Sequence, residues 1–116
     1  MKNIIIREII NGDIAVSTSD GDLIYNLLND YLSANKKIKI DFEGISILTT
    51  AFLNAAIGQL YSNPFYSDVF LNNHLELINV EKEDRILFSE VVKRAKEYFR
   101  DKKGFEDSAN SVIYGD

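Results

Sequence analysis

The stretch IKIDFEGISILTTAFLNAAIGQL, residues 38–60, decides the fold. It begins with apolar side chains that alternate with charged ones, which is typical of a strand with one buried face: Ile38, Ile40 and Phe42. A strand between two helical layers would be apolar throughout, so we expect a sheet covered on one side only. The pair Thr49-Thr50 then precedes a segment that is apolar around most of its circumference, and this predicts the most buried helix. It should end near Ser62, because Pro64 cannot continue a helix.

Before this stretch, the sequence predicts a β-hairpin and an amphipathic helix. The β-branched run at residues 4–10 and the apolar residues 14–16 flank Asn11-Gly12, a dipeptide suited to a type I′ turn. The loop 17–22 follows, and leucine, isoleucine and tyrosine then recur at helical spacing over residues 23–32. Ser19 is the expected N-cap, with Asp22 in the capping-box position.

After this stretch, the sequence predicts an aromatic-rich loop over residues 63–74, a strand over 75–80 and a long helix over 81–103. The element order is therefore β-β-α-β-α-β-α. It indicates an α/β fold with a mixed four-stranded sheet and three helices mainly on one face. We expect one domain over residues 1–103 and a tail over 104–116, either flexible or a weak edge strand.

The composition excludes several classes of function. The chain has 116 residues, no cysteine, one histidine and a formal net charge of -5. A single chain can therefore form no disulfide, no thiolate metal site and no multi-histidine metal site. The position of His74 at a predicted turn favours a surface role for this residue over catalysis. The acidic balance disfavours nucleic acid and anionic membranes. We expect a cytoplasmic protein that is not an enzyme and uses no cofactor.

The arrangement over residues 38–60 resembles the STAS domain of bacterial anti-sigma factor antagonists. It is closer to the small bacterial STAS-like domains of unassigned function, which often lie beside or are fused to histidine-kinase-like ATPase domains. The resemblance implies a non-catalytic regulatory domain in signalling that binds such an ATPase.

The resemblance also implies a candidate switch. In the antagonist family an Asp-Ser or Asp-Thr pair opens the second helix, and the partner kinase phosphorylates its hydroxyl. The acidic position falls here on Thr49 and the acceptor on Thr50, followed by Ala51-Phe52 where the family has a small glycine. The residues themselves favour capping of the helix by a threonine hydroxyl, which stabilises it by about 1 kcal/mol. A phosphoacceptor at Thr50 or Thr49 is the alternative.

Further residues are candidates for contact with a partner. Asp20 and Gly21 lie near the expected start of the first helix and join Thr49 and Thr50 in the partner-binding set. The predicted loop over residues 63–74 has more aromatic side chains than a connecting loop needs, namely Phe65, Tyr66 and, nearby, Phe70. They either cover the core or dock a protein partner or a second copy of the chain in a homodimer.

A second class of function stays open. Asp41 and Glu43 are two residues apart on a predicted strand and, with Asp20 or Asp22, have the oxygen ligands that a hard cation prefers. On this alternative the chain is a small scaffold subunit of an enzyme or defence complex, with Asp20, Asp22 and Asp41 lining a ligand or metal cleft. Carboxylates that simply solubilise an exposed sheet face are the favoured interpretation, and we expect no metal.

Overall fold

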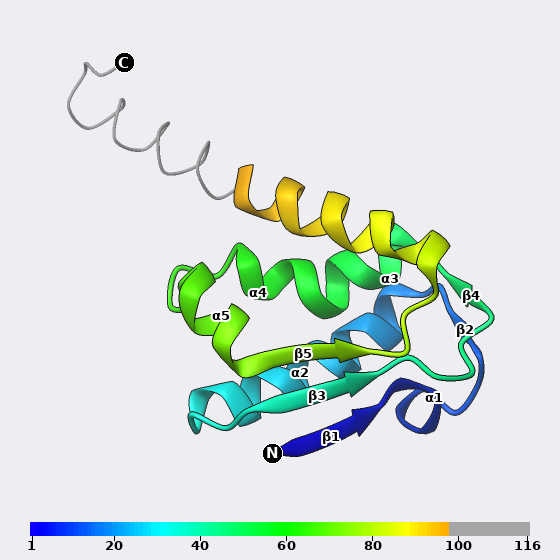
Figure 1. Ribbon diagram of the computed structural model, residues 1–116, viewed down its shortest axis with the longest axis horizontal. Helices are drawn as coiled ribbons and strands as arrows, with labels where there is room; N and C mark the ends of the chain where they lie inside the picture. Colours follow the sequence, from blue (N-terminus) through cyan, green and yellow to red (C-terminus); the bar gives the residue numbers. More distant parts are fainter. Residues whose placement is uncertain (98–116) are drawn as a thin grey trace.

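The computed structural model describes residues 1–97 of the chain. These residues contain a three-stranded parallel sheet. Its strands are β1 (Lys2–Ile5), β3 (Ile38–Asp41) and β5 (Leu75–Ile78), in the order β1-β3-β5 (Figure 1). Ile4 of β1 and Leu77 of β5 are both in register with Ile40 of β3, so these three side chains lie on one face of the sheet. Ile38 and Ile40 are fully buried, which confirms the alternation predicted for this strand.

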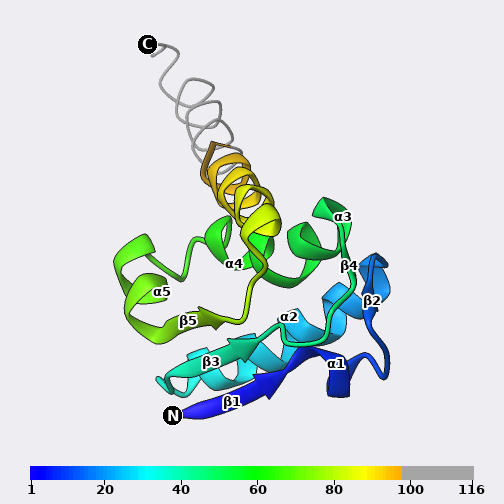
Figure 2. The ribbon, with the colours of Figure 1, turned by 45° about the vertical axis from the view of Figure 1, so that its right-hand side comes forward.

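A second, two-stranded sheet lies beyond the carboxyl ends of these strands (Figures 1 and 2). It pairs β2 (Ile14–Ala15) with β4 (Ile47–Leu48), again in parallel. The prediction of an α/β fold is confirmed, but the prediction of one mixed four-stranded sheet is wrong. The described residues form five strands in two sheets, and every pairing among them is parallel.

The predicted N-terminal hairpin is also wrong, because β1 and β2 belong to different sheets. Between them the chain makes one turn of helix, α1 (Ile6–Ile9), which buries Ile6. Asn11 has the positive φ that the sequence suggested, at 57°. The Gly12 amide then donates to the Arg7 carbonyl at 3.1 Å, so the Asn-Gly pair ends a helical turn instead of joining two strands.

Helix α2 (Thr18–Ser33) is the amphipathic helix expected from the spacing of its apolar residues. Ile24, Leu28 and Leu32 are buried along one stripe. The helix starts earlier than predicted, and its N-cap is Ser17 instead of Ser19. The Ser17 backbone is extended, and its hydroxyl oxygen accepts a hydrogen bond from the Asp20 amide at 3.0 Å.

The second helix has a one-turn π-helical segment in its middle. It comprises α3 (Thr50–Leu53), the π segment η1 (Asn54–Gly58) and α4 (Gln59–Tyr61). The Gln59 amide donates to the Asn54 carbonyl, which leaves the Ala55 carbonyl without its usual partner. The side-chain amide of Gln59 donates to that carbonyl at 2.7 Å. The Ala55 carbonyl therefore keeps a hydrogen-bond donor despite the π-helical segment.

This helix packs most closely on α2. A Cβ atom placed on Gly21 of α2 would lie 2.6 Å from both the Ala55 Cβ and the Phe52 carbonyl oxygen. The helix is the most buried one, as predicted, since seven of its residues are buried: Phe52, Leu53, Ala55, Ala56, Ile57, Gly58 and Leu60. It lies with α2 on one face of the three-stranded sheet, and no described helix covers the other face (Figures 1 and 2).

Within the predicted aromatic loop, the structure has a short helix, α5 (Asp68–His74). Its N-cap is Ser67, whose hydroxyl oxygen accepts from the Phe70 amide at 3.0 Å. The helix buries Leu71 and leads directly into β5.

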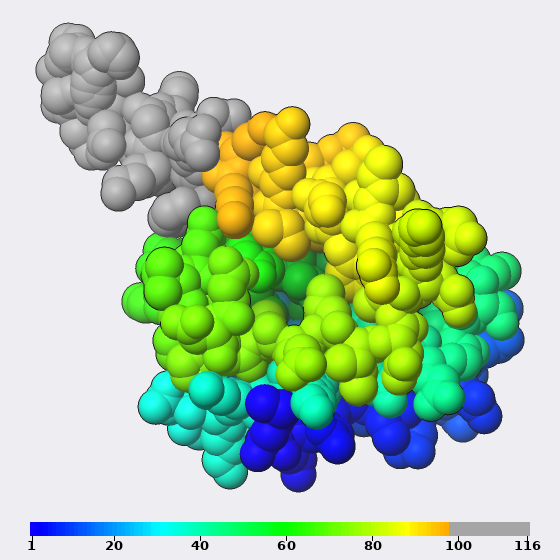
Figure 3. Space-filling model, viewed as in Figure 1, coloured from blue at the N-terminus to red at the C-terminus, as the bar shows by residue number. Residues whose placement is uncertain are grey.

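The last described elements are the 3₁₀ turn η2 (Lys82–Asp84) and the helical residues 85–97. These residues form a ridge along one side of the molecule (Figure 3). Phe88 attaches the ridge to the sheet, because its ring meets the Phe42 ring edge-on at 5.0 Å. The predicted continuation of this helix to residue 103 and the tail 104–116 lie outside the described residues.

Candidate functional site

The start of α3 lies against the end of β2. Thr49 is the N-cap of α3, and its hydroxyl oxygen accepts a hydrogen bond from the Phe52 amide at 3.3 Å. The same hydroxyl donates to the Val16 carbonyl at 3.3 Å, and the Thr49 amide donates to the Ala15 carbonyl at 3.2 Å. The predicted capping role is therefore present at Thr49, which also joins the helix to the end of β2.

Thr50 is in a different position. It is the first residue of α3, half-buried, and its hydroxyl makes no hydrogen bond to any side chain or backbone group within residues 1–97. A phosphoryl group on Thr49 would disrupt two hydrogen bonds, whereas one on Thr50 would disrupt none of those seen here. Of the two candidate phosphoacceptors, Thr50 has the free hydroxyl.

Beside these threonines, the β2–β4 ribbon exposes apolar side chains. Ile14 and Ile47 are register partners, and each is 49% exposed. Val16, which follows β2, is 39% exposed, whereas Ala15 faces inward and is buried. We call Ile14, Val16 and Ile47 the ribbon face. Large apolar side chains that are adjacent and exposed in this way are typical of interaction sites.

An acidic group borders the ribbon face. The Ser46 hydroxyl donates to the Asp13 carboxylate at 2.6 Å, and the Ser46 amide donates to the Asp13 carbonyl at 2.7 Å. The hydrogen bond from Ser46 is the largest cause that lowers the pKa of Asp13 below its ordinary value of 3.8, and nearby Arg7 lowers it further. Asp13 therefore stays ionised at neutral pH.

The sequence did not reveal this ribbon face. The strand β4 has only two residues, which is too short to show a period in the sequence. The available signal was the apolar pair Ile14 and Val16 followed by a second apolar pair, Ile45 and Ile47, each with one residue between. Nothing local indicates that residues 33 positions apart form a pair.

The remaining partner-binding candidates do not all lie here. Gly21 is buried between α2 and η1, where it allows the close approach of the two helices. Asp20 lies in the first turn of α2 and is half-buried. Phe65 and Tyr66 immediately precede α5, at the opposite end of the molecule from β2 and β4 (Figures 1 and 2). The predicted set is thus divided between two ends.

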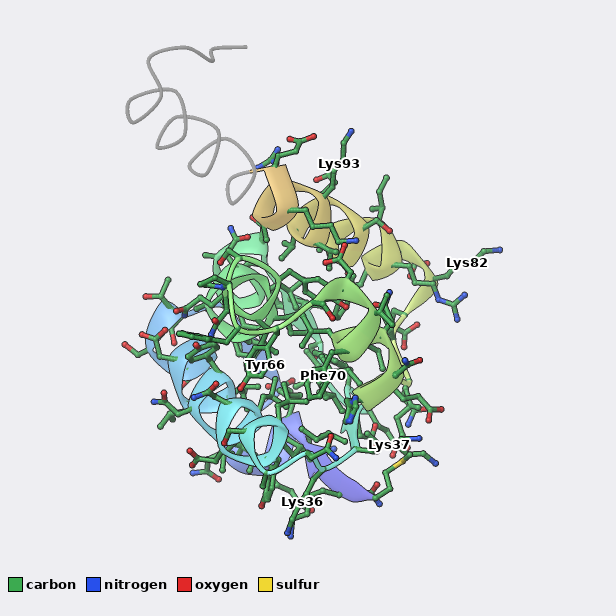
Figure 4. The ribbon with its side chains drawn as sticks, turned by 90° about the vertical axis from the view of Figure 1, so that its left-hand side faces the viewer. Lys36, Lys37, Tyr66, Phe70, Lys82 and Lys93 are labelled. Carbon is green, nitrogen blue, oxygen red and sulfur yellow. The ribbon has the colours of Figure 1, made fainter. Side chains whose placement is uncertain are left out.

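The two aromatic candidates also differ from each other. Phe65 is 89% exposed, whereas Tyr66 is half-buried and its hydroxyl donates to the Asn29 side-chain oxygen at 2.6 Å. The Tyr66 ring stacks on Phe70 with centroids 5.6 Å apart, as their side-by-side position in Figure 4 shows. Burial is the first cause that raises the pKa of the Tyr66 hydroxyl. Tyr66 therefore packs on the body of the domain, and Phe65 projects from it.

The acidic residues proposed for a cation do not form a cluster. Asp22 accepts from the Gln59 side-chain amide at 3.1 Å, and Asp41 accepts from the Glu43 amide at 2.9 Å and from the Asn79 side chain at 2.8 Å. Within residues 1–97, no three histidine or acidic side chains are grouped so that they could hold a metal ion.

His74 forms hydrogen bonds through both ring nitrogens. Nδ1 lies 2.8 Å from the Phe70 carbonyl oxygen, and Nε2 lies 2.9 Å from the side-chain oxygen of Asn35. Its ring also stacks on Phe70, with centroids 3.9 Å apart. The histidine therefore joins α5 to the loop that follows α2.

Comparison with known families agrees with this architecture. Residues 20–85, more than half of the chain, match the family described as STAS-like domain of unknown function. The chain belongs to this family of STAS-like domains. No curated protein and no solved structure matches it. In the part of the chain that the structure describes, no helix has the length and apolar character needed to cross a membrane.

Proposed function

We propose that this chain is a non-catalytic, cytoplasmic regulatory domain that docks a protein partner on its ribbon face, with the start of α3 at the border of the contact. The partner is a histidine-kinase-like ATPase, as the resemblance to STAS-like domains implies. The observation that carries the proposal is the exposed pair Ile14 and Ile47, which are 49% exposed each and lie beside the capped start of α3.

The apolar character of the ribbon face supports docking. Fully burying an isoleucine side chain yields roughly 1.5–3 kcal/mol, so covering the exposed halves of Ile14 and Ile47 would contribute about 1.5–3 kcal/mol together. That amount corresponds to roughly a tenfold to a hundredfold gain in affinity. A small central apolar patch of this kind is where the binding energy of an interface concentrates.

The charge beside this surface indicates what the partner presents. Asp13 is ionised, and Asp20 lies in the first turn of α2. A partner with an apolar centre and basic residues around it is complementary. A phosphoryl group on Thr50 would add about 1.5–2 negative charges at the border of the contact and would weaken binding if it were not matched by additional basic groups. This is how phosphorylation would release the partner.

The docking test uses the purified chain and a histidine-kinase-like ATPase from the same source. Ile47→Asp should weaken binding at least tenfold in isothermal titration calorimetry, because it places a charge in an apolar contact. Ile86→Asp is the matched control, since Ile86 is 64% exposed and lies outside the ribbon face. Both variants should retain the wild-type circular dichroism spectrum. Equal affinities for wild type and Ile47→Asp would reject the ribbon face as the docking site.

The switch has its own test. After incubation with the ATPase and ATP, the mass of the chain should rise by one phosphoryl group, and peptide mapping should place it on Thr50. Thr50→Val should prevent the modification and leave docking intact. A chain that binds the ATPase and stays unmodified would reject the switch alone.

A further inference from the structure

Three lysines gather at the amino ends of the strands, at the other end of the sheet from the ribbon face. Lys2 opens β1, and Lys36 and Lys37 lie in the loop before β3. With Met1 they line an open surface hollow of about 460 Å³. Figure 3 shows the N-terminal residues (dark blue) beside the residues of this loop (cyan). We call Lys2, Lys36 and Lys37 the lysine edge.

Backbone hydrogen bonds fix the position of this edge. Asn35 has a left-handed φ of 61°, and its amide donates to the Leu32 carbonyl at 2.9 Å. The Lys36 amide donates to the Tyr31 carbonyl at 3.0 Å, and the Lys2 amide donates to the Lys37 carbonyl at 2.8 Å. The loop therefore closes the end of α2 and joins β1, so little backbone entropy is lost when a ligand binds to it.

Side chains add to this support. His74 of α5 contacts the Asn35 side chain at 2.9 Å, and the Lys2 ammonium lies 5.3 Å from the centre of the Tyr31 ring. None of the three lysines forms an ion pair with a carboxylate of residues 1–97, where the ion pair found is between Lys96 and Asp68. The lysine edge therefore presents positive charge that the described part of the chain does not neutralise.

We propose that the lysine edge binds an acidic segment of a protein partner, through carboxylates spread along that segment. A lysine ammonium attracts an anion as a point charge and lacks the planar fork with which arginine grips a phosphate. The Lys2 and Lys36 amides already donate to carbonyls, so they are not available to cradle a phosphate. The hollow is wide and open, which suits several separated carboxylates better than one compact anion.

The overall charge of the chain favours the same class of ligand. A formal net charge of -5 repels nucleic acid and anionic membranes at long range, where their charge density is high. A short acidic peptide carries fewer charges and can meet the lysine edge alone. Its attraction should fall as salt screens it, since the Debye length is about 10 Å at 0.1 M ionic strength.

The test is an NMR experiment in which a peptide is titrated into the ¹⁵N-labelled full chain. The chain carries no tag at Met1. The probe is a capped octaglutamate peptide at low salt. The amide signals of Lys2, Lys36 and Lys37 should shift, and the affinity should fall as salt is added. The double variant K36E/K37E should bind at least tenfold more weakly. The variant K82E/K93E changes the net charge by the same amount, and Figure 4 shows both of its sites apart from Lys36 and Lys37; it should bind like the wild type.

Three results would overturn the proposal. They are the absence of shifts at the lysine edge, equal weakening in both double variants, and tighter binding of pyrophosphate than of the peptide at the same amides. The last result would assign the edge to phosphate instead of a protein segment. None of these results bears on docking at the ribbon face, which uses other residues.

Discussion

Replacing Gly21 by alanine should destabilise the domain, although alanine is the better helix former. Gly21 lies inside α2, where alanine would gain about 1 kcal/mol of helix propensity. The added Cβ would, however, lie 2.6 Å from the Ala55 Cβ and 2.6 Å from the Phe52 carbonyl oxygen. The second neighbour is backbone, so it can give way only if the whole second helix shifts.

The magnitude follows from these two opposing effects. Overpacking a close contact costs about 1–3 kcal/mol, and two contacts that no side-chain rotation can relieve, to a Cβ and to a backbone oxygen, place Gly21→Ala near the upper end of that range. After the gain in propensity is subtracted, we expect a net loss of about 2 kcal/mol. For a chain of 116 residues, that loss lowers Tm by about 8 °C.

The assay is urea unfolding followed by circular dichroism, with Gly12→Ala as the matched control. A Cβ on Gly12 would have no neighbour within 4 Å, so this variant should stay within about 0.5 kcal/mol of the wild type. The double variant G21A/A55G removes one of the two contacts and should be more stable than the sum of its single variants indicates, by about 0.5–3 kcal/mol. A Gly21→Ala variant as stable as the wild type would refute the close approach of α2 and η1.

Two further predictions concern the region around the start of α3. Thr49→Val should cost about 1 kcal/mol in urea unfolding because it removes the capping hydrogen bond, whereas Thr50→Val should change stability by less than about 0.5 kcal/mol; equal losses would contradict the division of roles. Ser46→Ala should raise the pKa of Asp13 toward its ordinary value of 3.8, as measured by NMR of the carboxyl carbon. Because the pKa of Asp13 is lowered on folding, the stabilisation is present above pH 3.8 and is lost as the pH falls through the folded-state pKa. The stability lost in Ser46→Ala should therefore be seen at neutral pH and disappear in acid, and a pH-independent loss would count against this cause.

The elements that could be predicted from the sequence are those whose own residues repeat with a clear period. In α2, the side chains at 24, 28 and 32 are spaced by one helical turn and are all buried. In β3, the alternation at residues 38–42 matches the two faces of the sheet. In each case one buried face is long enough to leave a period in the sequence.

The elements that could not be predicted depend on partners far along the chain. Asn11 has the positive φ expected of a type I′ turn but Gly12 does not, and the pair ends a turn of helix, because β1 pairs with β3 and not with β2. The seven-residue helix α5 was missed because its cap, Ser67, is followed by too few residues to show helical spacing. Tertiary pairing decided the structure at Asn11-Gly12, whereas α5 is too short to leave a period in the sequence.

The same reason explains why only half of the candidate site emerged from the sequence. The cap at Thr49 is a local property, since the hydroxyl and the amide that it accepts from are three residues apart. The ribbon face is non-local, because Ile14 and Ile47 meet across 33 residues. Gly21 was expected at a partner contact because it lies near the helix start, but it is the packing of η1 that requires a residue without a side chain there.

The two proposed surfaces differ in physical character and lie at opposite ends of the three-stranded sheet. The ribbon face lies beyond the carboxyl ends of the strands, and the lysine edge lies at their amino ends (Figure 1). One partner could therefore be held at each end at the same time without competition. Salt separates the two contacts: burial of Ile14 and Ile47 is apolar and should withstand ionic strength, whereas attraction to Lys36 and Lys37 should be screened. If one protein occupied both ends, raising the salt concentration would weaken its contact with Lys36 and Lys37. The contact that depends on Ile47 would remain.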